Sequence, residues 1–333
     1  MTVAHAQVPA GEDRGHPFTG EPWPAVSAAH RAELTGYCYR MLGSIFDAED
    51  AVQETLLRAW RARDDFAGRA SVRTWLFRIA TNVCLDLLRG RARRALPVDL
   101  GEPSPPVLAL LGAPEPGWVE PAPDAAVLPA TDDPAEVAVA RESVRLAFVA
   151  ALQHLPPRQR AVLILRDVLR WRADEVAGLL DATVASVNSA LQRARATMAG
   201  RAGTAPAAEL DAAHRELLDR YVDLFERYDV DALVALLQAD AVHSMPPYAL
   251  WLRGPRDIGR WMLGPGAECR GSRLLPIAAN GGSGFGQYRP DPAGGHRPFS
   301  VQLVSTDGAG ITAITHFLEP RLFPLFGLPD RLP

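Results

Sequence analysis

A proline-rich, acidic segment divides this chain of 333 residues and limits what can fold around it. Residues 97–136 contain eight acidic residues and no arginine. A proline ring fixes φ and removes a backbone donor, so such a stretch can form no long helix. We therefore expect a linker here, with Trp118 and Val119 as a local docking point. Its prolines are Pro97, Pro103, Pro105, Pro106, Pro114, Pro116, Pro121, Pro123, Pro129 and Pro134.

Helical patterns lie on both sides of this linker, and a mixed pattern follows them. Residues 1–26 are rich in alanine, proline, glycine and charge, so we expect a disordered tail. Apolar residues recur at helical spacing over 27–96 and again over 135–201. A second short linker, 202–208, precedes residues 209–333, where helices are followed by strand-like runs. The sequence therefore predicts a multi-domain protein with two all-α helical domains and one α+β cone.

The boundaries of the expected elements follow from breaks in these patterns. The third helix of the first domain is expected from Val72 to about Arg91. One long helix is expected from 135 to about His154, because two prolines follow it. Other expected helices cover 158–169, 173–180, 186–199, 209–228, 230–238 and 256–263. Expected strands cover 241–245, 250–254, 272–280, 284–289, 299–306 and 310–318.

One expected helical face near residue 50 carries two carboxylates and an amide. Asp50, Gln53 and Glu54 share a stripe with Leu57 and Arg61 at helical spacing. Such a stripe can dock on a basic partner helix, and it can equally be an ordinary solvated face. The residues expected to lie elsewhere and face a core are Ala48, Val52, Thr55 and Ala59.

Positive charge is concentrated in two segments, although the net charge of the chain is −4. Residues 58–96 hold 10 arginines against 3 acidic residues, and residues 137–203 hold 10 against 5. All 35 basic residues are arginine, which a GC-rich coding sequence explains more simply than a need for bidentate contacts to phosphate and guanine. Two basic segments separated by an acidic one suit nucleic-acid contact at two places.

The first basic segment interleaves arginines with aromatic side chains. Unpaired bases need aromatic or apolar pockets, the nucleic-acid backbone needs positive charge, and the loop 64–72 is a place where an extruded base could be captured. Trp75 and Phe77 can instead be core residues, and the arginines merely solvated. The candidate DNA-contacting residues are Phe66, Arg69, Ser71, Arg73, Trp75, Arg78, Asn82, Arg89, Arg91, Arg93 and Arg94.

The second basic segment has the pattern of a helix-turn-helix. Residues 172–180 supply a first helix, and 186–198 supply a recognition helix with Val187, Leu191 and Ala194 facing inward. A plain helical hairpin is the alternative. The exposed side chains expected to read base edges or hold phosphates are Ser186, Asn188, Ser189, Gln192, Arg193 and Arg195.

Cysteine usage and hydropathy exclude several classes of protein. Cys38, Cys84 and Cys269 are widely spaced and form no CxxC motif, so neither a zinc site nor a disulfide framework is expected. We expect no metal and no cofactor. The N-terminus is polar and no apolar run approaches ~18 residues, so we expect no signal peptide and no membrane span. A cytoplasmic protein follows.

These motifs together resemble the sigma-70-type initiation factors of RNA polymerase. The stretch 30–95 resembles region 2, and residues 74–89 look like the extracytoplasmic-function (ECF) group, in which this segment melts and reads the minus-ten element. Asp50, Gln53 and Glu54 match the face that the family uses on the β′ clamp. Residues 155–171 and the helices after them are similar to region 4, which reads the minus-35 element. The resemblance implies core RNA polymerase (β′ clamp and β flap) and promoter DNA as partners.

Two features depart from the compact members of that group. The linker is long and acidic, and we hypothesise that it mimics nucleic acid in the polymerase channel. The chain also continues past region 4, where residues 214–258 resemble SnoaL-like domains of the NTF2-like superfamily. In ECF groups with such a tail, the resemblance implies that the tail modulates sigma activity in cis.

The tail leaves three functions open: catalysis, ligand sensing and a purely structural regulatory contact. Candidate pocket residues are His243, Tyr248, Trp251, His316 and Glu319. They form no clear catalytic dyad, so we do not expect an enzyme. A freestanding helix-turn-helix repressor with a sensor domain is the competing reading, but it has no use for the stripe at 50–54.

Overall fold

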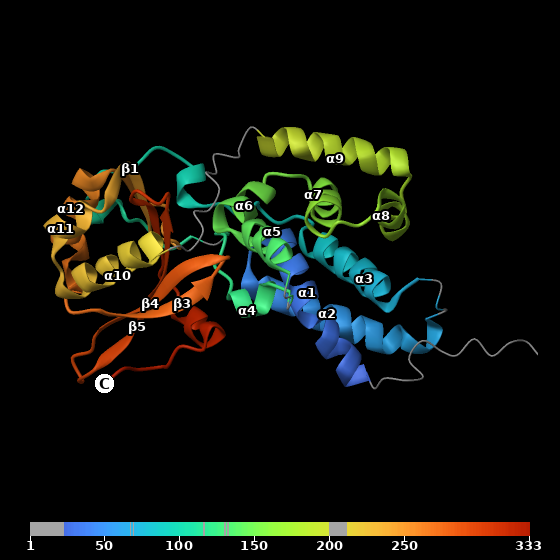
Figure 1. Cartoon of the computed structure of the whole chain (residues 1–333), viewed down its shortest axis with the longest axis horizontal. Helices are drawn as coiled ribbons and strands as arrows, with labels where there is room; N and C mark the ends of the chain where they lie inside the picture. Colours follow the sequence, from blue (N-terminus) through green and yellow to red (C-terminus); the bar gives the residue numbers. More distant parts are fainter. Residues whose placement is uncertain are drawn as a thin grey trace, which may run out of the picture.

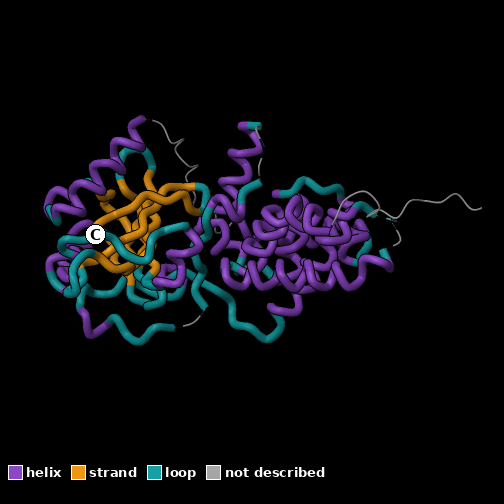
Figure 2. Tube along the Cα trace, turned by 90° about the horizontal axis from the view of Figure 1, so that it is seen from below, coloured by secondary structure: helices purple, strands orange, loops and turns teal. Residues whose placement is uncertain are grey.

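The protein consists of a helical lobe and a lobe built around one sheet, joined side by side (Figures 1 and 2). This confirms the expected multi-domain class of two helical domains and one α+β domain. The expected disordered tail lies outside the described residues up to position 22. This computed structural model describes residues 23–66, 68, 70–115, 117–129, 131, 133–199 and 212–333.

The first helical domain contains α1 (Trp23–Leu42), α2 (Ile45–Ala62) and α3 (Val72–Leu87). Ser44 and Ser71 cap α2 and α3, because each hydroxyl accepts the backbone N–H three residues later. Helix α1 begins four residues before the expected start, with the Trp23 ring 5.8 Å from that of Trp60. Helix α3 ends at Leu87, short of the expected Arg91.

The second helical domain contains the helix-turn-helix. Its elements are α5 (Pro134–Val144), α6 (Leu146–Leu152), α7 (Pro157–Leu163), a π-helical turn (Ile164–Val168), α8 (Ala173–Leu180) and α9 (Val184–Ala199). The single helix expected from 135 to 154 is wrong, because Arg145 is extended with ψ 139°. The Asn280 side chain donates to the Val144 carbonyl at 2.7 Å. This tertiary hydrogen bond satisfies a backbone carbonyl at the point where the helix is interrupted.

The tail domain consists of a six-stranded mixed sheet and three helices that pack against it. The helices are α10 (Ala212–Arg227), α11 (Val230–Val234) and α12 (Pro255–Leu263), and the strands are β1 (Leu237–Ser244), β2 (Trp251–Arg253), β3 (Arg273–Ala279), β4 (Gly282–Pro290), β5 (His296–Thr306) and β6 (Ile311–Phe317). The strand order is β2-β1-β6-β5-β4-β3, and only β1 and β6 run parallel. All six expected strands are present. The helix expected over 230–238 ends at Val234, because Leu237 pairs with Ile311 of β6.

The described residues of the linker lie against both the tail and α1. It contains two short 3₁₀ helices (Pro97–Asp99 and Leu108–Leu110) and α4 (Asp124–Val127). Residues 101–115, here called the strap, are held at both ends: Ser104 N donates to Trp251 O and Glu115 N to Pro247 O, each at 2.8 Å. Trp118 Nε1 also donates to Pro247 O at 2.8 Å, which confirms the expected docking point.

The tip of the β3–β4 hairpin joins all parts of the chain. Asn280 sits in the left-handed region (φ 54°), and its side chain donates to Tyr39 Oη and Val144 O and accepts from Ala122 N. The next residue, Gly281, lies so close to α5 that a Cβ atom would be 2.5 Å from the Arg141 carbonyl. One buried side chain thus bonds to the first helical domain, the second helical domain and the linker.

We predict that Asn280→Gly weakens this junction by about 2 to 4 kcal/mol, because buried backbone groups lose their partners. Glycine also adopts the left-handed conformation, so the turn itself is preserved. Faster hydrogen exchange at the amides of Val119, Glu120, Ala122 and Asp124 is the expected result. Asn82→Ala, at an exposed asparagine, is the control and should change nothing. Equal exchange in both variants would contradict the assignment.

Candidate functional site

The outer face of α2 carries the expected polar stripe. Asp50 and Gln53 are exposed, and Glu54 forms an ion pair with Arg58 at 2.6 Å. Leu57 and Trp60 are each 42% exposed beside them, so the face also presents apolar surface. Sequence reasoning missed Trp60, whose ring stacks under Arg63 at 3.6 Å. The residues expected to face the core, Ala48, Val52, Thr55 and Ala59, are all buried.

The start of α3 borders a cavity of about 690 Å³ that fits the expected base-capture position. Phe66 is buried, and its ring lies 4.7 Å from that of Trp75, which is half-buried. Trp75 packs on the core and also lines the cavity, and its contact with an unpaired base stays a prediction. Ser71 and Arg78 line the cavity as well, whereas Asn82 lies on a separate exposed surface beside Arg89. Arg69 lies outside the described residues.

Helix α8 of the helix-turn-helix closes the far side of this cavity. Asp174 and Glu175 line it opposite Arg78. The two helical domains are also joined nearby, where the Phe77 and Trp171 rings are 5.1 Å apart. Phe77 is fully buried, which agrees with its reading as a core residue. The cavity is therefore shared between the two domains.

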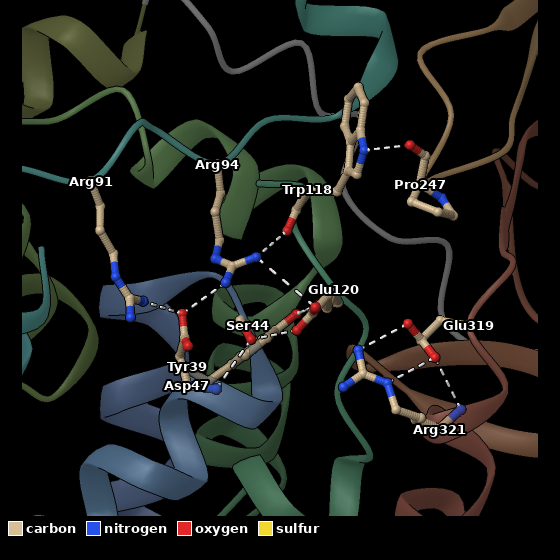
Figure 3. A network of polar contacts seen from close by, with 10 residues as sticks. All are labelled: Tyr39, Ser44, Asp47, Arg91, Arg94, Trp118, Glu120, Pro247, Glu319 and Arg321. Atoms are coloured by element: carbon tan, nitrogen blue, oxygen red, sulfur yellow. Dashed lines mark hydrogen bonds and ion pairs between the residues drawn. The ribbon is translucent and has the colours of Figure 1, made fainter. Parts of the chain in front are cut away.

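Three arginines expected to contact DNA are paired with other groups of the protein, and two of them, Arg91 and Arg93, remain exposed. Arg91 and Arg94 donate to Asp47 at 2.9 and 2.7 Å, and Arg94 also donates to the Trp118 carbonyl (Figure 3). Arg93 bonds to His154 at 2.5 Å. Asp47, which the sequence argument left out, thus neutralises part of the cluster 89–94.

The network around Asp47 continues into the linker. Ser44 donates to Glu120, and burial raises the pKa of that carboxyl (Figure 3). Arg94 lies 4.0 Å from the same carboxylate. An acid of the linker is therefore used as an internal partner of the first helical domain.

Arg73 and Arg89 differ sharply in exposure. Arg73 donates to both oxygens of Glu33, at 2.9 Å for one, and its guanidinium lies 4.8 Å from the centre of the Trp171 ring. It therefore ties α1, α3 and the second helical domain together. Arg89 is 81% exposed, with a loose ion pair to Asp86 at 3.3 Å. Of the two, Arg89 is the one that presents its charge to solvent.

The outer face of α9 has the expected composition. Val187, Leu191 and Ala194 are buried, as predicted, and pack α9 on α7 and α8. The helix begins at Val184, two residues early, with the Thr183 hydroxyl accepting from Ser186 N. The candidate residues are all exposed: Ser186, Asn188, Ser189, Gln192, Arg193 and Arg195. Arg195 is paired with Asp167 at 2.7 Å.

The tail contains a largely apolar cavity of about 240 Å³. Three candidates line it, His243, Tyr248 and His316, and the two imidazoles pack at a tilt of 42° with centroids 4.7 Å apart. Burial lowers the pKa of His243 to about 4, and burial together with its neighbour His243 lowers the pKa of His316 well below its usual value. Both rings are therefore neutral near pH 7.

Two tail candidates lie away from this cavity. Trp251 is buried, but its Nε1 donates to Gly101 O of the strap at 3.2 Å, so it holds the linker. Glu319 is paired with Arg321 at 3.0 Å (Figure 3). Their expected place in the pocket is wrong, because β2 and the segment after β6 direct them to the domain junction. Sequence reasoning missed Leu108 and Leu111 of the strap, which line the cavity.

Comparisons with known proteins agree with this architecture. Residues 27–94 match Sigma-70 region 2, and residues 145–198 match Sigma-70, region 4. The ECF RNA polymerase sigma factor SigG of Mycobacterium tuberculosis is 46% identical over 331 residues, covering 97% of this chain and 87% of SigG. SigJ of the same species is 30% identical over 243 residues, covering 71% of this chain and 70% of SigJ. The crystal structure of SigJ shares the fold, with a TM-score of 0.60 at 24% identity over 92% of this chain and 100% of that one.

The matched families cover the two helical domains, and the SigG and SigJ matches extend into the tail. In the part of the chain that the structure describes, no helix is long and apolar enough to cross a membrane. This chain belongs to the ECF group of sigma-70-family RNA polymerase sigma factors.

Proposed function

We propose that this chain directs core RNA polymerase to promoters through three separate surfaces. The first domain, 23–96, acts as region 2, the domain over 135–201 acts as region 4, and the segment 97–134 joins them. The tail over 209–333 modulates their activity in cis. The observation that carries the proposal is the exposure of two unrelated polar faces, on α2 and α9, each backed by a fully buried apolar side.

The face of α2 suits a basic partner. Two exposed carboxylates and an amide form a compact acidic surface, and the neighbouring Leu57 and Trp60 add apolar area. Interfaces of this composition bind through a few aromatic anchors, while charge sets orientation and association rate. We assign this face to the β′ clamp of the polymerase and leave the β flap to the second helical domain.

Promoter DNA is assigned to the α3 cavity and to α9. Phe66 and Trp75 offer aromatic surface to an unpaired base, and Arg78 and Arg89 offer exposed charge to the backbone. On α9, Asn188, Gln192 and Arg193 are residue types that pair with base edges in a major groove. Because these arginines are attracted to DNA phosphates and displace counterions, the affinity for DNA should fall steeply as the salt concentration rises.

Promoter engagement requires the two helical domains to separate. The minus-ten and minus-35 elements are about 25 base pairs apart, or roughly 85 Å of duplex at about 3.4 Å per pair. Here α8 and α3 line one cavity. We infer that α8 leaves this cavity when the polymerase binds, which exposes Trp75 and Arg78 to DNA.

The tail supports control rather than catalysis. Its cavity histidines are neutral and pack against each other, and the lining carboxylate Glu268 is already paired with Arg289 at 2.5 Å. No acid–base pair poised for proton transfer is formed by these groups. We therefore propose that the chain is not an enzyme, that it acts in the cytoplasm beside its polymerase, and that the tail works by holding the linker.

Several acidic residues of the linker, which we hypothesise to mimic nucleic acid, form hydrogen bonds within the protein. Asp99 caps Leu96 N, Glu120 bonds to Ser44, and Asp124 accepts from Gly281 N at 2.7 Å. These acids stabilise the compact arrangement. We propose that they become available to a basic polymerase channel only after the linker leaves the tail.

Glu54→Arg should reduce capture of core polymerase at least about tenfold, because it reverses the charge of the α2 face. Asp223→Arg is the matched control, since Asp223 is also exposed and also forms an i,i+4 ion pair at 2.6 Å with an arginine. Pull-down at increasing polymerase concentration measures the effect. Equal capture by both variants would remove α2 from the polymerase interface and favour the repressor reading.

Arg193→Ala should weaken promoter binding by the holoenzyme by about 1 to 3 kcal/mol. It should also reduce the slope of log K against log salt concentration by about one. Arg227→Ala, which removes an exposed arginine from the tail, should leave both unchanged. Binding is measured by titrating salt on a promoter fragment selected from genomic DNA that the holoenzyme transcribes. An unchanged salt slope for Arg193→Ala would exclude a phosphate contact there.

Deletion of residues 204–333 should change the transcript yield while core polymerase is still captured, because the linker loses its binding surface. Asn280→Gly should shift the yield in the same direction by loosening the same contact. Run-off transcription with saturating polymerase measures both. Identical yields from the truncated and full chains would rule out control by the tail.

A further inference from the structure

The tail cavity has the size and lining of a small-molecule site. It lies between β1, β5 and β6 of the sheet and helices α10, α11 and α12. An apolar protein cavity of about 150 Å³ holds a benzene molecule. The volume here is about 240 Å³, so it suits a compound with two fused rings. The aromatic lining residues include Tyr221, Phe225 and Trp261.

One polar atom of a side chain that lines this apolar cavity lacks a hydrogen-bond partner among the described residues. Nδ1 of His243 is buried and has no hydrogen-bond partner among the described residues. Buried polar groups in native proteins are almost always satisfied, because an unmade hydrogen bond costs free energy. The residue is 6% exposed and lines the cavity, so a hydroxyl group of a bound molecule can form a hydrogen bond to its imidazole ring. A neutral imidazole nitrogen accepts or donates, and a hydroxyl group can meet either need.

The charges around the cavity favour an uncharged ligand. His243 and His316 are neutral, so neither attracts an anion. Arg289 lines the wall, but its charge is compensated by Glu268 at 2.5 Å. Bringing an ionised group into this apolar space would cost desolvation energy with no free counter-charge to offset it.

The strap supplies part of the cavity wall. Leu108 and Leu111 line it, and Leu111 packs against the tail core while Leu108 remains 59% exposed. Leu110 of the same 3₁₀ helix is 52% exposed and does not line the cavity. A molecule in the cavity therefore touches the linker between the two DNA-binding domains, and it stabilises the strap in its docked position.

We propose that the tail cavity binds an uncharged, largely apolar two-ring compound through a hydroxyl group bonded to His243, with the strap as one wall of the site. Ligand occupancy then holds the linker on the tail. Binding itself does not require the chain to act as a sigma factor, and only its consequence for transcription rests on the proposed function.

The probe for this site is 2-naphthol, with naphthalene and 2-naphthoate as comparison compounds. The full chain should bind 2-naphthol saturably, naphthalene about tenfold more weakly, and 2-naphthoate most weakly. His243→Leu should weaken binding of 2-naphthol to the level of naphthalene and leave naphthalene binding unchanged. Fluorescence titration measures all three. Equal affinity for 2-naphthol and naphthalene in the unaltered chain overturns the role of His243.

The strap is tested by a pair of variants within one turn. Leu111→Ser should weaken 2-naphthol binding several-fold, whereas Leu110→Ser should not, although the two positions are adjacent at the end of the same 3₁₀ helix. Saturating 2-naphthol should slow hydrogen exchange at Ser104, Leu111 and Glu115 in the unaltered chain. Binding that is equal in both variants, together with unchanged exchange, overturns the strap as a wall. Absence of saturable binding of 2-naphthol overturns the site, and because no polymerase is present it leaves the promoter assignment intact.

Discussion

The compact arrangement depends on a two-residue turn. Asn280 and Gly281 both adopt positive φ, the requirement of the tight hairpin turn that joins β3 to β4. The same two residues also make the tertiary contacts. The Asn280 side chain forms hydrogen bonds to three segments. Gly281 lets α5 approach more closely than a residue with a Cβ atom would allow. A local backbone constraint thereby sets the position of the tail against both helical domains.

The contact between the two helical domains is polar as well as apolar. Arg40 donates to Ser143, and Arg160 donates to Met41 O and to Gln153 at 2.5 Å. Burial lowers the pKa of each guanidinium to about 10. Arginines in such a position recover hydration when the domains part, which offsets part of the lost packing. A junction built in this way is stable when closed, and it costs less to open than a purely apolar core of the same size.

Charge pairing divides the arginines into two classes. Arg73 and Arg94 are held by acids of α1 and α2, and these contacts fix α3 and the segment after it against those helices, while Arg91 shares Asp47 and stays half-exposed. Arg89 and Arg193 are exposed, and exposed ion pairs contribute little to stability. Their charge is therefore available to phosphate without loss to the fold. A count of arginines along the sequence cannot make this distinction, because the partner acids are 40 or more positions away.

The sequence by itself determined the local features: the buried and exposed faces of α2 and α9, the positions of six strands, and the docking of Trp118. Side-chain periodicity and proline placement fix these features within a few residues, since they depend on neighbours in the chain. Only the tertiary structure decided that the helix after Pro134 breaks at Arg145, that Trp251 faces the strap, and that Leu108 and Leu111 wall the tail cavity. Each of these features depends on a contact between segments far apart in sequence. The free energy of such a contact comes from packing and hydrogen bonding, which the local sequence pattern does not predict.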